Sequence, residues 1–494
     1  MKILMVSSEA TPFAKAGGLA DAVSALSRAL QRAGHDVRIL LPRYYCVDRT
    51  KLERVTESFS VEWPAGSIQA GLYKSVLPSS KVPVYFIDHE GLFGRDGIYG
   101  TKAEPDFADN TERFGLLSRA AFKLCRHLSW FPDILHAHDW PTSLVPVYLR
   151  ELERGGDFAR TASVLTVHNL GYQGAYPAGR FPSTGLPWER FGPAGFERGS
   201  TLNLLAAGIH SADFLTTVSP TYAREIQTPA LGAGLDGLLR HRSASLVGIL
   251  NGVDESEWNP ESDPHIPRTY GPASLSAKDE SKARLQAAMG LPIDPTVPLI
   301  GMTTRLSEQK GIGELFGPLH GSAWRICTEM RVQMAILGSG ETWCEDELRS
   351  LASRLPNFRA RIGYDEALAH LITAGSDFFL MPSHYEPCGL AQLYALRYGT
   401  LPIVRRTGGL ADTVENYDET SGSGTGFMFD QLTPSSVFDT AGWAVWAWYN
   451  RPAQVLEMRK RAMSRVFSWD RSAAEYLKLY EMALAAAKKA GAAH

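Results

Sequence analysis

Short apolar runs alternate with amphipathic stretches along the first half of the chain. Residues 3–6 are apolar, and beyond a polar stretch apolar side chains recur at helical spacing from Leu19 to Leu30. A second apolar run follows at 37–41. This strand–helix–strand order is typical of a parallel sheet with helices on both faces. Further strands are expected at 82–87, 133–137, 163–167, 214–218 and 244–250.

The second half repeats this alternation. Between the halves, the stretch 259–298 holds seven prolines, which predicts a long connection with a short helix at 278–289. An amphipathic segment after Asp470 predicts a terminal helix, with Tyr476, Tyr480, Ala483 and Leu484 along one stripe. Strands of the second half are expected at 299–303, 332–337, 378–381 and 401–404, and helices near 341–354, 366–374 and 389–398.

We therefore predict an α/β protein with two Rossmann-like, doubly wound domains. The first domain is expected at 1–248, the second at 249–469, and the terminal helix at about 470–494. Sheets of this kind bind ligands beyond the carboxyl ends of their strands. A site is therefore expected in a cleft across which the two domains face each other.

Composition and charge narrow the class of protein. The chain has 494 residues, 44% hydrophobic and 21% charged, which suits a soluble enzyme with sizeable cores. Its formal net charge of −3 argues against a nucleic-acid binder. No stretch approaches the ~20 apolar residues of a membrane span, and the run at 3–6 is too short for a signal peptide. Five scattered cysteines without a C-x-x-C pair favour a reducing compartment, so a cytoplasmic protein is expected.

The first candidate for ligand chemistry is the turn Lys15-Ala16-Gly17-Gly18-Leu19, which opens the first helix. Glycines let the backbone approach a ligand closely, amides at a helix start favour an anion, and the lysine adds a full charge. The spacing matches neither the dinucleotide fingerprint nor the P-loop. A plain turn with a solvated lysine fits this segment equally well.

Two loops of the second half also follow predicted strands. The first contains Arg305 and Lys310, and paired cations at such a place can hold a departing diphosphate. The second, 382–390, has Glu386 as its only acid, and a carboxylate there can bind sugar hydroxyls or support a cationic sugar carbon. A charged surface turn is the alternative for each loop.

Three more motifs follow predicted strands. The H-x-H-D pattern at 136–139 invites a metal interpretation, but no third ligand is indicated by spacing, and no metal is expected. The motif 166–169 contains His168, and an isolated histidine is more often structural than functional. The motif 405–412 contains a second glycine turn. Each motif is weak alone, but their recurrence at strand ends in both halves favours a site.

Together these motifs resemble the bacterial glycogen synthase and plant starch synthase family, from Met1 to about Tyr480. The resemblance implies the two-Rossmann GT-B fold, ADP-glucose as donor, an α-1,4-glucan (glycogen or maltodextrin) extended at its non-reducing end, and retention of configuration. It implies no cofactor, no metal ion, and a terminal helix that returns to the first domain. The motifs are KAGGL at 15–19, HAHDW at 136–140, VSPTY at 218–222, LNGVD at 250–254, the loop with Arg305 and Lys310, EPCGL at 386–390 and TGGLADT at 407–413.

The resemblance also implies roles for individual residues. Glu386 would lie at the glucose, His168 close to the reacting carbon, and Tyr364 against the adenine. Asp139 and Asn169 would contact sugar hydroxyls. The residues implied to act on the donor diphosphate are Lys15, the Gly17 and Gly18 amides with Asp21 nearby, and, from the second domain, Arg305 and Lys310. Further donor-binding positions are Asn251, Cys388, Gly389, Leu390, Thr407, Gly408 and Gly409.

The sequence departs from the family pattern at several positions. His384-Tyr385 stand where the family has Arg-Phe, Ala391 replaces a threonine, and Ala206 replaces a lysine. These changes bear on donor affinity and rate rather than on reaction class. Tyr394 replaces a glutamate of the wider retaining GT-B group, which the starch synthase branch also lacks, and this favours ADP-glucose over UDP- or GDP-sugars.

Three other classes of function stay open at this point. They are a retaining GT-B transferase with another donor or acceptor, a sugar-nucleotide 2-epimerase, and a glucan-binding protein with weak catalysis. ADP release, epimer formation from donor alone, and glucan binding without turnover distinguish them.

Overall fold

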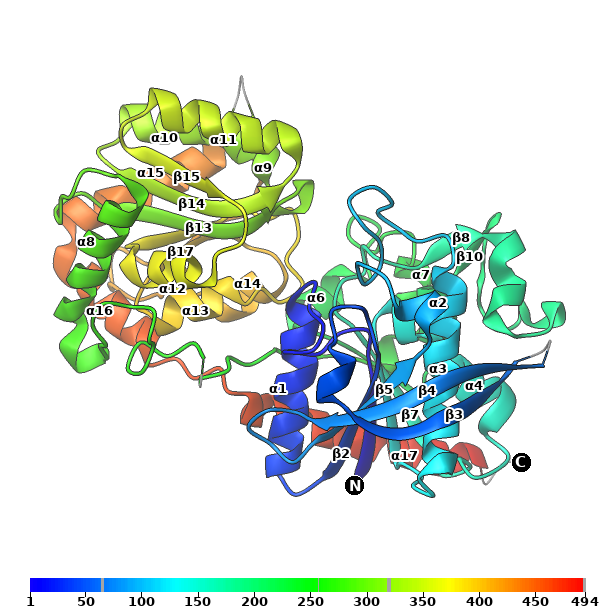
Figure 1. Ribbon diagram of the computed structural model, residues 1–494. Coiled ribbons are helices and arrows are strands. Elements are labelled where there is room, and N and C mark those ends of the chain that lie inside the picture. Colours follow the sequence, from blue (N-terminus) through cyan, green and yellow to red (C-terminus); the bar gives the residue numbers. More distant parts are fainter. Residues whose placement is uncertain (64–65, 256, 318–320, 492–494) are drawn as a thin grey trace. The chain divides into compact units, whose positions relative to one another are not determined.

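The computed structural model describes residues 1–63, 66–255, 257–317 and 321–491, which belong to two units (Figure 1). Unit 1 comprises Met1–Gly252 and Trp469–His494, and unit 2 comprises Val253–Ser468. The division after Gly252 lies a few residues beyond the boundary at 248 that the sequence predicts.

Unit 1 is built on a nine-stranded sheet, in the order β12-β11-β7-β6-β1-β2-β5-β4-β3. The strands from β12 to β5 pair in parallel, and the last two pairings are antiparallel. The bounds are β1 (Lys2–Val6), β2 (Asp36–Pro42), β3 (Glu53–Trp63), β4 (Gly66–Val76), β5 (Pro83–Asp88), β6 (Ile134–His138), β7 (Ala162–Val167), β11 (Phe214–Thr217) and β12 (Leu246–Gly248). A small antiparallel sheet, in the order β8-β10-β9, contains β8 (Ala175–Pro177), β9 (Glu197–Arg198) and β10 (Thr201–Asn203).

The helices of unit 1 include the last helix of the chain, drawn in red in Figure 1. This helix, α17, packs on the first helix and on β7. It buries Tyr476, Tyr480 and Ala483 in one core with side chains of β1 and β2, and Leu484 packs against that core. The bounds are α1 (Gly18–Arg32), α2 (Glu90–Phe93), α3 (Asn110–His127), α4 (Leu144–Tyr148), α5 (Leu204–Ser211), α6 (Pro220–Glu225), α7 (Asp236–His241) and α17 (Trp469–Gly491).

Unit 2 is built on a six-stranded, wholly parallel sheet in the order β15-β14-β13-β16-β17-β18. Its strands are β13 (Leu299–Leu306), β14 (Gln333–Gly340), β15 (Phe358–Ile362), β16 (Phe378–Met381), β17 (Leu401–Arg405) and β18 (Phe427–Phe429). Its helices are α8 (Lys278–Met289), α9 (Ile312–Phe316), α10 (Ser322–Glu329), α11 (Thr342–Arg354), α12 (Glu366–Gly375), α13 (Ala391–Arg397), α14 (Gly408–Thr413), α15 (Pro434–Asn450) and α16 (Pro452–Met463).

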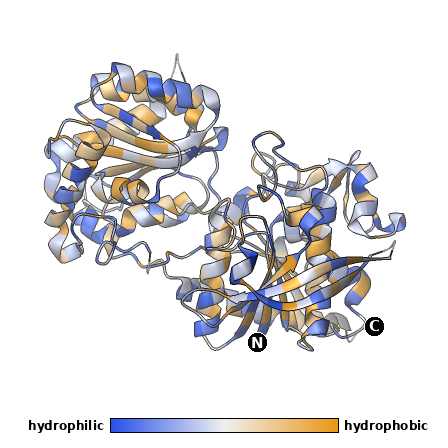
Figure 2. Cartoon of the chain, in the orientation of Figure 1, coloured by the Kyte–Doolittle hydropathy of each residue, from blue (hydrophilic) through white to orange (hydrophobic). Residues whose placement is uncertain are grey.

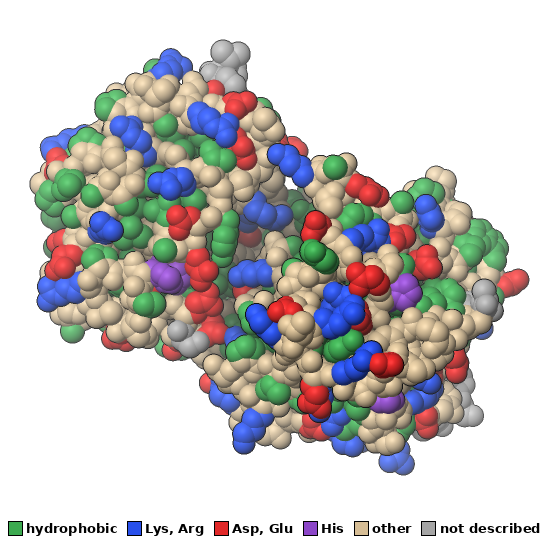
Figure 3. Space-filling model, in the orientation of Figure 1, with side chains coloured by type: hydrophobic (Ala, Val, Ile, Leu, Met, Phe, Trp, Pro, Cys, Tyr) green, Lys and Arg blue, Asp and Glu red, His purple; other side chains and the backbone are tan. Residues whose placement is uncertain are grey.

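The hydrophobic pattern explains why these strands form. All four residues after Lys2 in β1 are buried, as are all six of β7, because helices cover both faces of the parallel part of the sheet. Figure 2 shows hydrophobic residues along the central strands of each unit and mixed colouring on the covering helices. On the face drawn in Figure 3, positive and negative side chains are interspersed, in keeping with the small net charge.

Several elements differ from the sequence-based expectation. The strand expected at 244–250 is shorter, because 243–245 form a 3-10 turn before β12. The hairpin of β3 and β4 has no apolar run, since most of its side chains are exposed or half-buried.

Candidate functional site

In unit 1, the predicted site residues follow three neighbouring parallel strands, β7, β6 and β1. The Lys15 turn comes after β1, Asp139 directly after β6, and His168 and Asn169 directly after β7. Because the carboxyl ends of parallel strands meet at one edge of a sheet, these residues belong to one site of this unit.

Lys15 lines a cavity within unit 1. Its ammonium pairs with the Asp21 carboxylate at 2.9 Å, and the Thr11 hydroxyl donates to the same carboxylate at 2.7 Å. The cavity has a volume of about 710 Å³ and is also lined by Tyr44, Tyr45 and residues of the segment 95–101. A lysine anchored beside a cavity of this size can hold an anionic ligand.

Glu9 shapes the glycine turn, although no sequence pattern predicted it as a site residue. Its carboxylate accepts from the Ala16 amide at 2.5 Å, from the Gly17 amide at 2.9 Å, and from the Tyr99 hydroxyl. Burial raises the pKa of Glu9, while the hydrogen bonds from Tyr99 and the two amides lower it. The Gly17 amide, expected to contact the donor diphosphate, is therefore engaged by a carboxylate of the protein itself.

Asp139 joins the ends of β6 and β7. One oxygen of its carboxylate accepts from the His168 amide at 2.6 Å and from the Asn169 amide at 3.4 Å. Its backbone has φ 57°, which non-glycine residues rarely adopt outside functional sites and turns. Burial raises the pKa of Asp139 to about 7. The hydrogen bonds from the His168 and Asn169 backbone amides act in the opposite direction and lower this pKa. The carboxylate thus fixes the loop that carries His168.

The histidines of the H-x-H-D motif have separate roles. His136 Nδ1 lies 2.8 Å from the Tyr480 hydroxyl and its Nε2 lies 2.7 Å from the Thr166 hydroxyl, so this side chain ties α17 to the sheet. His138 Nδ1 lies 3.1 Å from His168 Nε2. Burial lowers the pKa of His168 to about 3, so its imidazole is neutral. Among the residues described, no group of possible metal ligands forms around this motif.

Asn251 lies next to the boundary of unit 1 and is buried. Within the described part of the chain, its Oδ1 atom has no hydrogen-bond partner. A buried polar atom of this kind is costly unless a ligand or water satisfies it, which suits a binding position.

In unit 2, the predicted residues again follow three neighbouring parallel strands, β13, β16 and β17. β13 extends past the end expected at 303, so Arg305 is its penultimate residue rather than part of the following loop, and Lys310 ends the 3-10 turn that comes next. Glu386 lies in the loop after β16, and the second glycine turn lies after β17. The structure therefore brings these three loops to one edge of the sheet of unit 2.

Lys310 and Glu386 form an ion pair in which the Nζ and Oε2 atoms are 2.5 Å apart. The Ser383 hydroxyl donates to the same oxygen at 3.1 Å. Only 6% of the Glu386 side chain is exposed. The carboxylate is thus held in one place by a cation and a hydroxyl. Sequence reasoning found the two charged residues but neither their pairing nor Ser383.

The second glycine turn packs against the Glu386 loop. A Cβ atom on Gly408 would lie 1.9 Å from the Glu386 carbonyl oxygen, and one on Gly409 would lie 2.0 Å from the Cys388 carbonyl oxygen. The Gly409 amide donates to the Glu386 carbonyl at 3.0 Å. Glycine is required here for close approach of two loops, and the Gly409 amide, expected to contact the donor, is engaged within the protein.

The other expected donor positions of unit 2 differ in exposure. Tyr364 is 83% exposed, in the loop between β15 and α12. Cys388 and Thr407 are buried, and Thr407 directly precedes α14. Gly389 has φ +69°, and Leu390 directly precedes α13.

The departures from the family pattern have local partners. The His384 imidazole lies 3.1 Å from the Glu314 carboxylate. The Tyr394 ring stacks on Trp258, with centroids 4.0 Å apart. The Ala206 amide donates to Asn203 at the start of α5. Ala391, at the start of α13, packs against a core cluster of unit 2. The Tyr385 carbonyl accepts from the Gln309 side chain at 3.3 Å.

Comparison with known proteins agrees with this arrangement. The family model described as starch synthase catalytic domain matches residues 2–241, and the model described as glycosyl transferases group 1 matches residues 289–439. A glycogen synthase of Treponema denticola is 57% identical over 484 residues, covering 98% of this chain and 99% of that protein. The catalytic domain of starch synthase IV from Arabidopsis thaliana superposes with a TM-score of 0.89 and 32% identity, covering 98% and 99% of the two chains.

A sucrose-phosphate synthase from Thermosynechococcus elongatus has the same fold, with a TM-score of 0.58 and 17% identity over 98% of this chain. Two doubly wound units, each with charged loops at the strand ends, define a glycosyltransferase of the GT-B fold. The chain belongs to the glycogen and starch synthase family. The fold, the family and the enzyme class expected from the sequence are confirmed. In the part of the chain that the structure describes, no helix has the length and apolar character to cross a membrane.

Proposed function

We propose that this glycosyltransferase transfers glucose from ADP-glucose to the non-reducing end of an α-1,4-glucan, with retention of configuration. The observation that carries the proposal is the Lys310–Glu386 pair at the strand ends of unit 2. It combines a cation for a leaving diphosphate with a fixed carboxylate for a sugar. The starch synthase IV domain, similar over nearly its whole length, was solved bound to ADP and acarbose.

The first chemical step is cleavage of the bond between glucose C1 and the diphosphate oxygen. The sugar gains positive charge and ADP gains negative charge as this bond stretches. Lys310 and Arg305 in unit 2, and Lys15 in unit 1, would stabilise the departing diphosphate. Preorganised charges of this kind act without the reorganisation that water would need. Because Glu9 engages the Gly17 amide, we expect the first-turn amides of α1 to contact the phosphate together with the Lys15 ammonium, which Asp21 positions.

Retention requires either a carboxylate nucleophile or attack on the same face as departure. The two acids implied to contact the sugar are already engaged, Glu386 by Lys310 and Ser383, and Asp139 by the amides of His168 and Asn169. We therefore favour same-face attack by the acceptor hydroxyl, with its proton passing to the departing phosphate oxygen. Glu386 would orient the glucose, and Asp139 and Asn169 would bind sugar hydroxyls beside the neutral His168 imidazole.

Donor and acceptor are tested with an ADP- or UDP-release assay on glycogen and a panel of sugar nucleotides. We expect the highest kcat/KM with ADP-glucose, and product whose new bonds are cut by an α-1,4-specific glucosidase. A higher kcat/KM for UDP-glucose would overturn the donor assignment. Release of nucleotide without glucan extension would overturn the acceptor assignment.

Metal independence and location are part of the same proposal. Three cations supplied by the chain would take the place of a metal at the diphosphate, so activity is expected to survive exhaustive treatment with EDTA. Loss of activity that Mg²⁺ restores would contradict this. None of the five cysteines forms a disulfide in the described part of the chain, which supports a reducing compartment such as the cytoplasm.

A further inference from the structure

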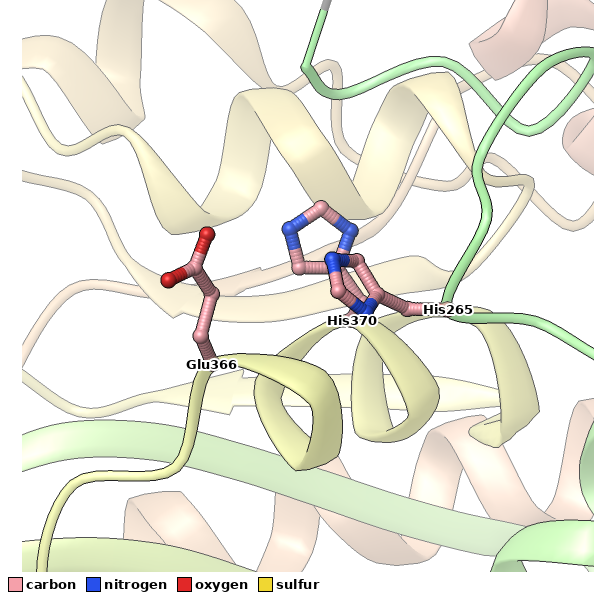
Figure 4. Close-up of side chains that lie close together, drawn as sticks. All are labelled: His265, Glu366 and His370. Carbon is pink, nitrogen blue, oxygen red and sulfur yellow. The ribbon is translucent and has the colours of Figure 1, made fainter.

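One group of possible metal ligands in unit 2 belongs to none of the loops assigned to the sugar donor. It consists of His265, Glu366 and His370, each with one ligand atom within 4.8 Å of the others. Glu366 and His370 are four residues apart on α12, so their side chains lie on one face of the helix. Figure 4 shows the Glu366 carboxylate and the His370 ring above this helix, with the His265 ring beside them.

His370 is held like a metal-binding histidine. Its Nδ1 atom lies 2.8 Å from Asp263 Oδ2, and the same carboxylate oxygen accepts from the Tyr398 hydroxyl at 2.6 Å. Since a carboxylate only accepts, the Nδ1–H group is the donor, which leaves Nε2 as the ring nitrogen that can bind a ligand. Carboxylates bonded in this way fix the orientation of metal-ligating histidines and raise their basicity.

The Nε2 atom of His370 provides an independent observation. The side chain is 1% exposed, and this atom has no hydrogen-bond partner among the described residues. Trp258 stacks on the ring face with centroids 3.7 Å apart, so a ligand must approach in the ring plane. A buried nitrogen left without a partner is costly unless something binds it.

His265 is placed by the same aspartate. Its backbone amide donates to Asp263 Oδ1 at 2.8 Å, and its ring centroid lies 4.7 Å from that of His370. One buried carboxylate therefore positions both histidines, while Glu366 and His265 remain exposed to solvent. The site is preformed on one side and open to an arriving ion on the other.

We propose that His265, Glu366 and His370 bind a divalent transition-metal ion, with Zn²⁺ as the preferred ion. Two imidazole nitrogens and one carboxylate oxygen are a common ligand set of three for zinc, with water as the fourth ligand. The ion joins the loop that carries His265 to the start of α12. We assign the ion no part in the transfer reaction, because its three ligands lie outside the loops that carry Lys310 and Glu386.

The test measures Zn²⁺ binding to the full chain after removal of metal by EDTA and dialysis. All proteins carry Cys46→Ser, because an exposed thiol such as that of Cys46 is itself able to bind zinc. Zn²⁺ is titrated in competition with a chromophoric chelator, and Co²⁺ is used to detect four-coordinate geometry from its visible absorption. The ligand variants are His265→Asn and Glu366→Gln. The matched control carries His241→Asn and Glu329→Gln, which are exposed residues of other helices.

We expect one Zn²⁺ per chain, at least a tenfold loss of affinity in each ligand variant, and unchanged affinity in the control. Zinc should also raise the Tm of the parent protein and of the control more than that of either ligand variant. Both ligand variants change exposed side chains and leave the buried His370 in place, so folding is retained. Absence of stoichiometric binding at micromolar free Zn²⁺ would overturn the proposal. So would parent-like affinity in either ligand variant.

Discussion

At the scale of single residues, Lys310 has the most closely defined surroundings in the candidate site. Replacement by alanine removes a preorganised cation from the diphosphate, so kcat should fall by about 10²–10³-fold. The replacement also removes the positive charge that balances the buried Glu386 carboxylate, although the Ser383 hydrogen bond to it remains. This loss should lower the Tm. Steady-state kinetics with ADP-glucose and a thermal melt measure the two effects. The control is Lys51→Ala, at an exposed lysine on another part of the chain, and near-normal turnover of Lys310→Ala would contradict the assignment.

Glu9 is a positioning residue, because it acts through the amides of the turn that carries Lys15. Glu9→Ala leaves two amides without their acceptor, which should cost about 1–3 kcal/mol and lower kcat/KM about tenfold. Glu9→Gln keeps one acceptor oxygen and should lie between the alanine variant and the parent. A structural role alone would lower the Tm without this graded change in kcat/KM, so both are measured on the same preparations.

The sequence predicted most charged members of the site but not how they contact one another. The Asp139 carboxylate reaches the His168 amide because β6 and β7 pair with Ile134 opposite Ala162, a register that no local pattern encodes. The role of Glu9 was not predictable for a similar reason, since its partner Tyr99 lies 90 residues away in the chain. Strand-end residues are predictable from local periodicity, whereas their partners depend on tertiary pairing.

At the scale of elements, His136 links β6 to β7 and to α17 and should make stability depend on pH. Burial lowers its pKa to about 3, against about 6.5 in an unfolded chain. The folded-state pKa is the lower one, so this stabilisation is complete above pH 6.5 and is lost as the pH falls towards 3. In that window the unfolded chain binds a proton that the folded chain does not. The slope contributed is about 1.4 kcal/mol per pH unit.

The measurement is urea unfolding of the parent and of His136→Gln between pH 7 and pH 4.5. The difference in unfolding free energy between the two proteins should shrink as the pH falls, because only the parent carries the buried imidazole at this position. Comparing slopes removes the opposing effect of Asp139, whose pKa is raised, since it is present in both proteins. His241→Gln, at an exposed histidine, should keep the parent slope. A constant difference between the parent and His136→Gln would refute this account.

The elements that were predictable are those with short, wholly buried runs. The run that predicts β7 is such a case, because all six residues of that strand are buried. β15, with the sequence FRARI, has one buried residue, and its other four residues are half-buried or exposed, so it has no apolar run that predicts a strand. Most side chains of the β3–β4 hairpin are likewise exposed or half-buried, so the hydrophobic pattern does not predict it. Burial on both faces, rather than strand propensity, is what the sequence pattern reports.

At the scale of the whole molecule, each described core belongs to one unit. The three core clusters of unit 2 draw on residues between Ile266 and Met463. The core of unit 1 combines residues up to Ile249 with residues of α17 from Trp469 to Ala487. Unit 2 is therefore continuous in sequence, whereas unit 1 needs a helix from the far end of the chain.

This difference predicts opposite outcomes for two truncations. The fragment 253–468 keeps all of its core and should unfold in one cooperative transition by circular dichroism. The fragment 1–468 loses α17, which exposes the apolar side chains of α1 and leaves His136 without Tyr480, so its unit 1 should aggregate or unfold without cooperativity. Adding back a synthetic peptide of residues 469–491 should restore part of the cooperative transition. Two unimpaired transitions in 1–468 would show that α17 is dispensable for the fold of unit 1.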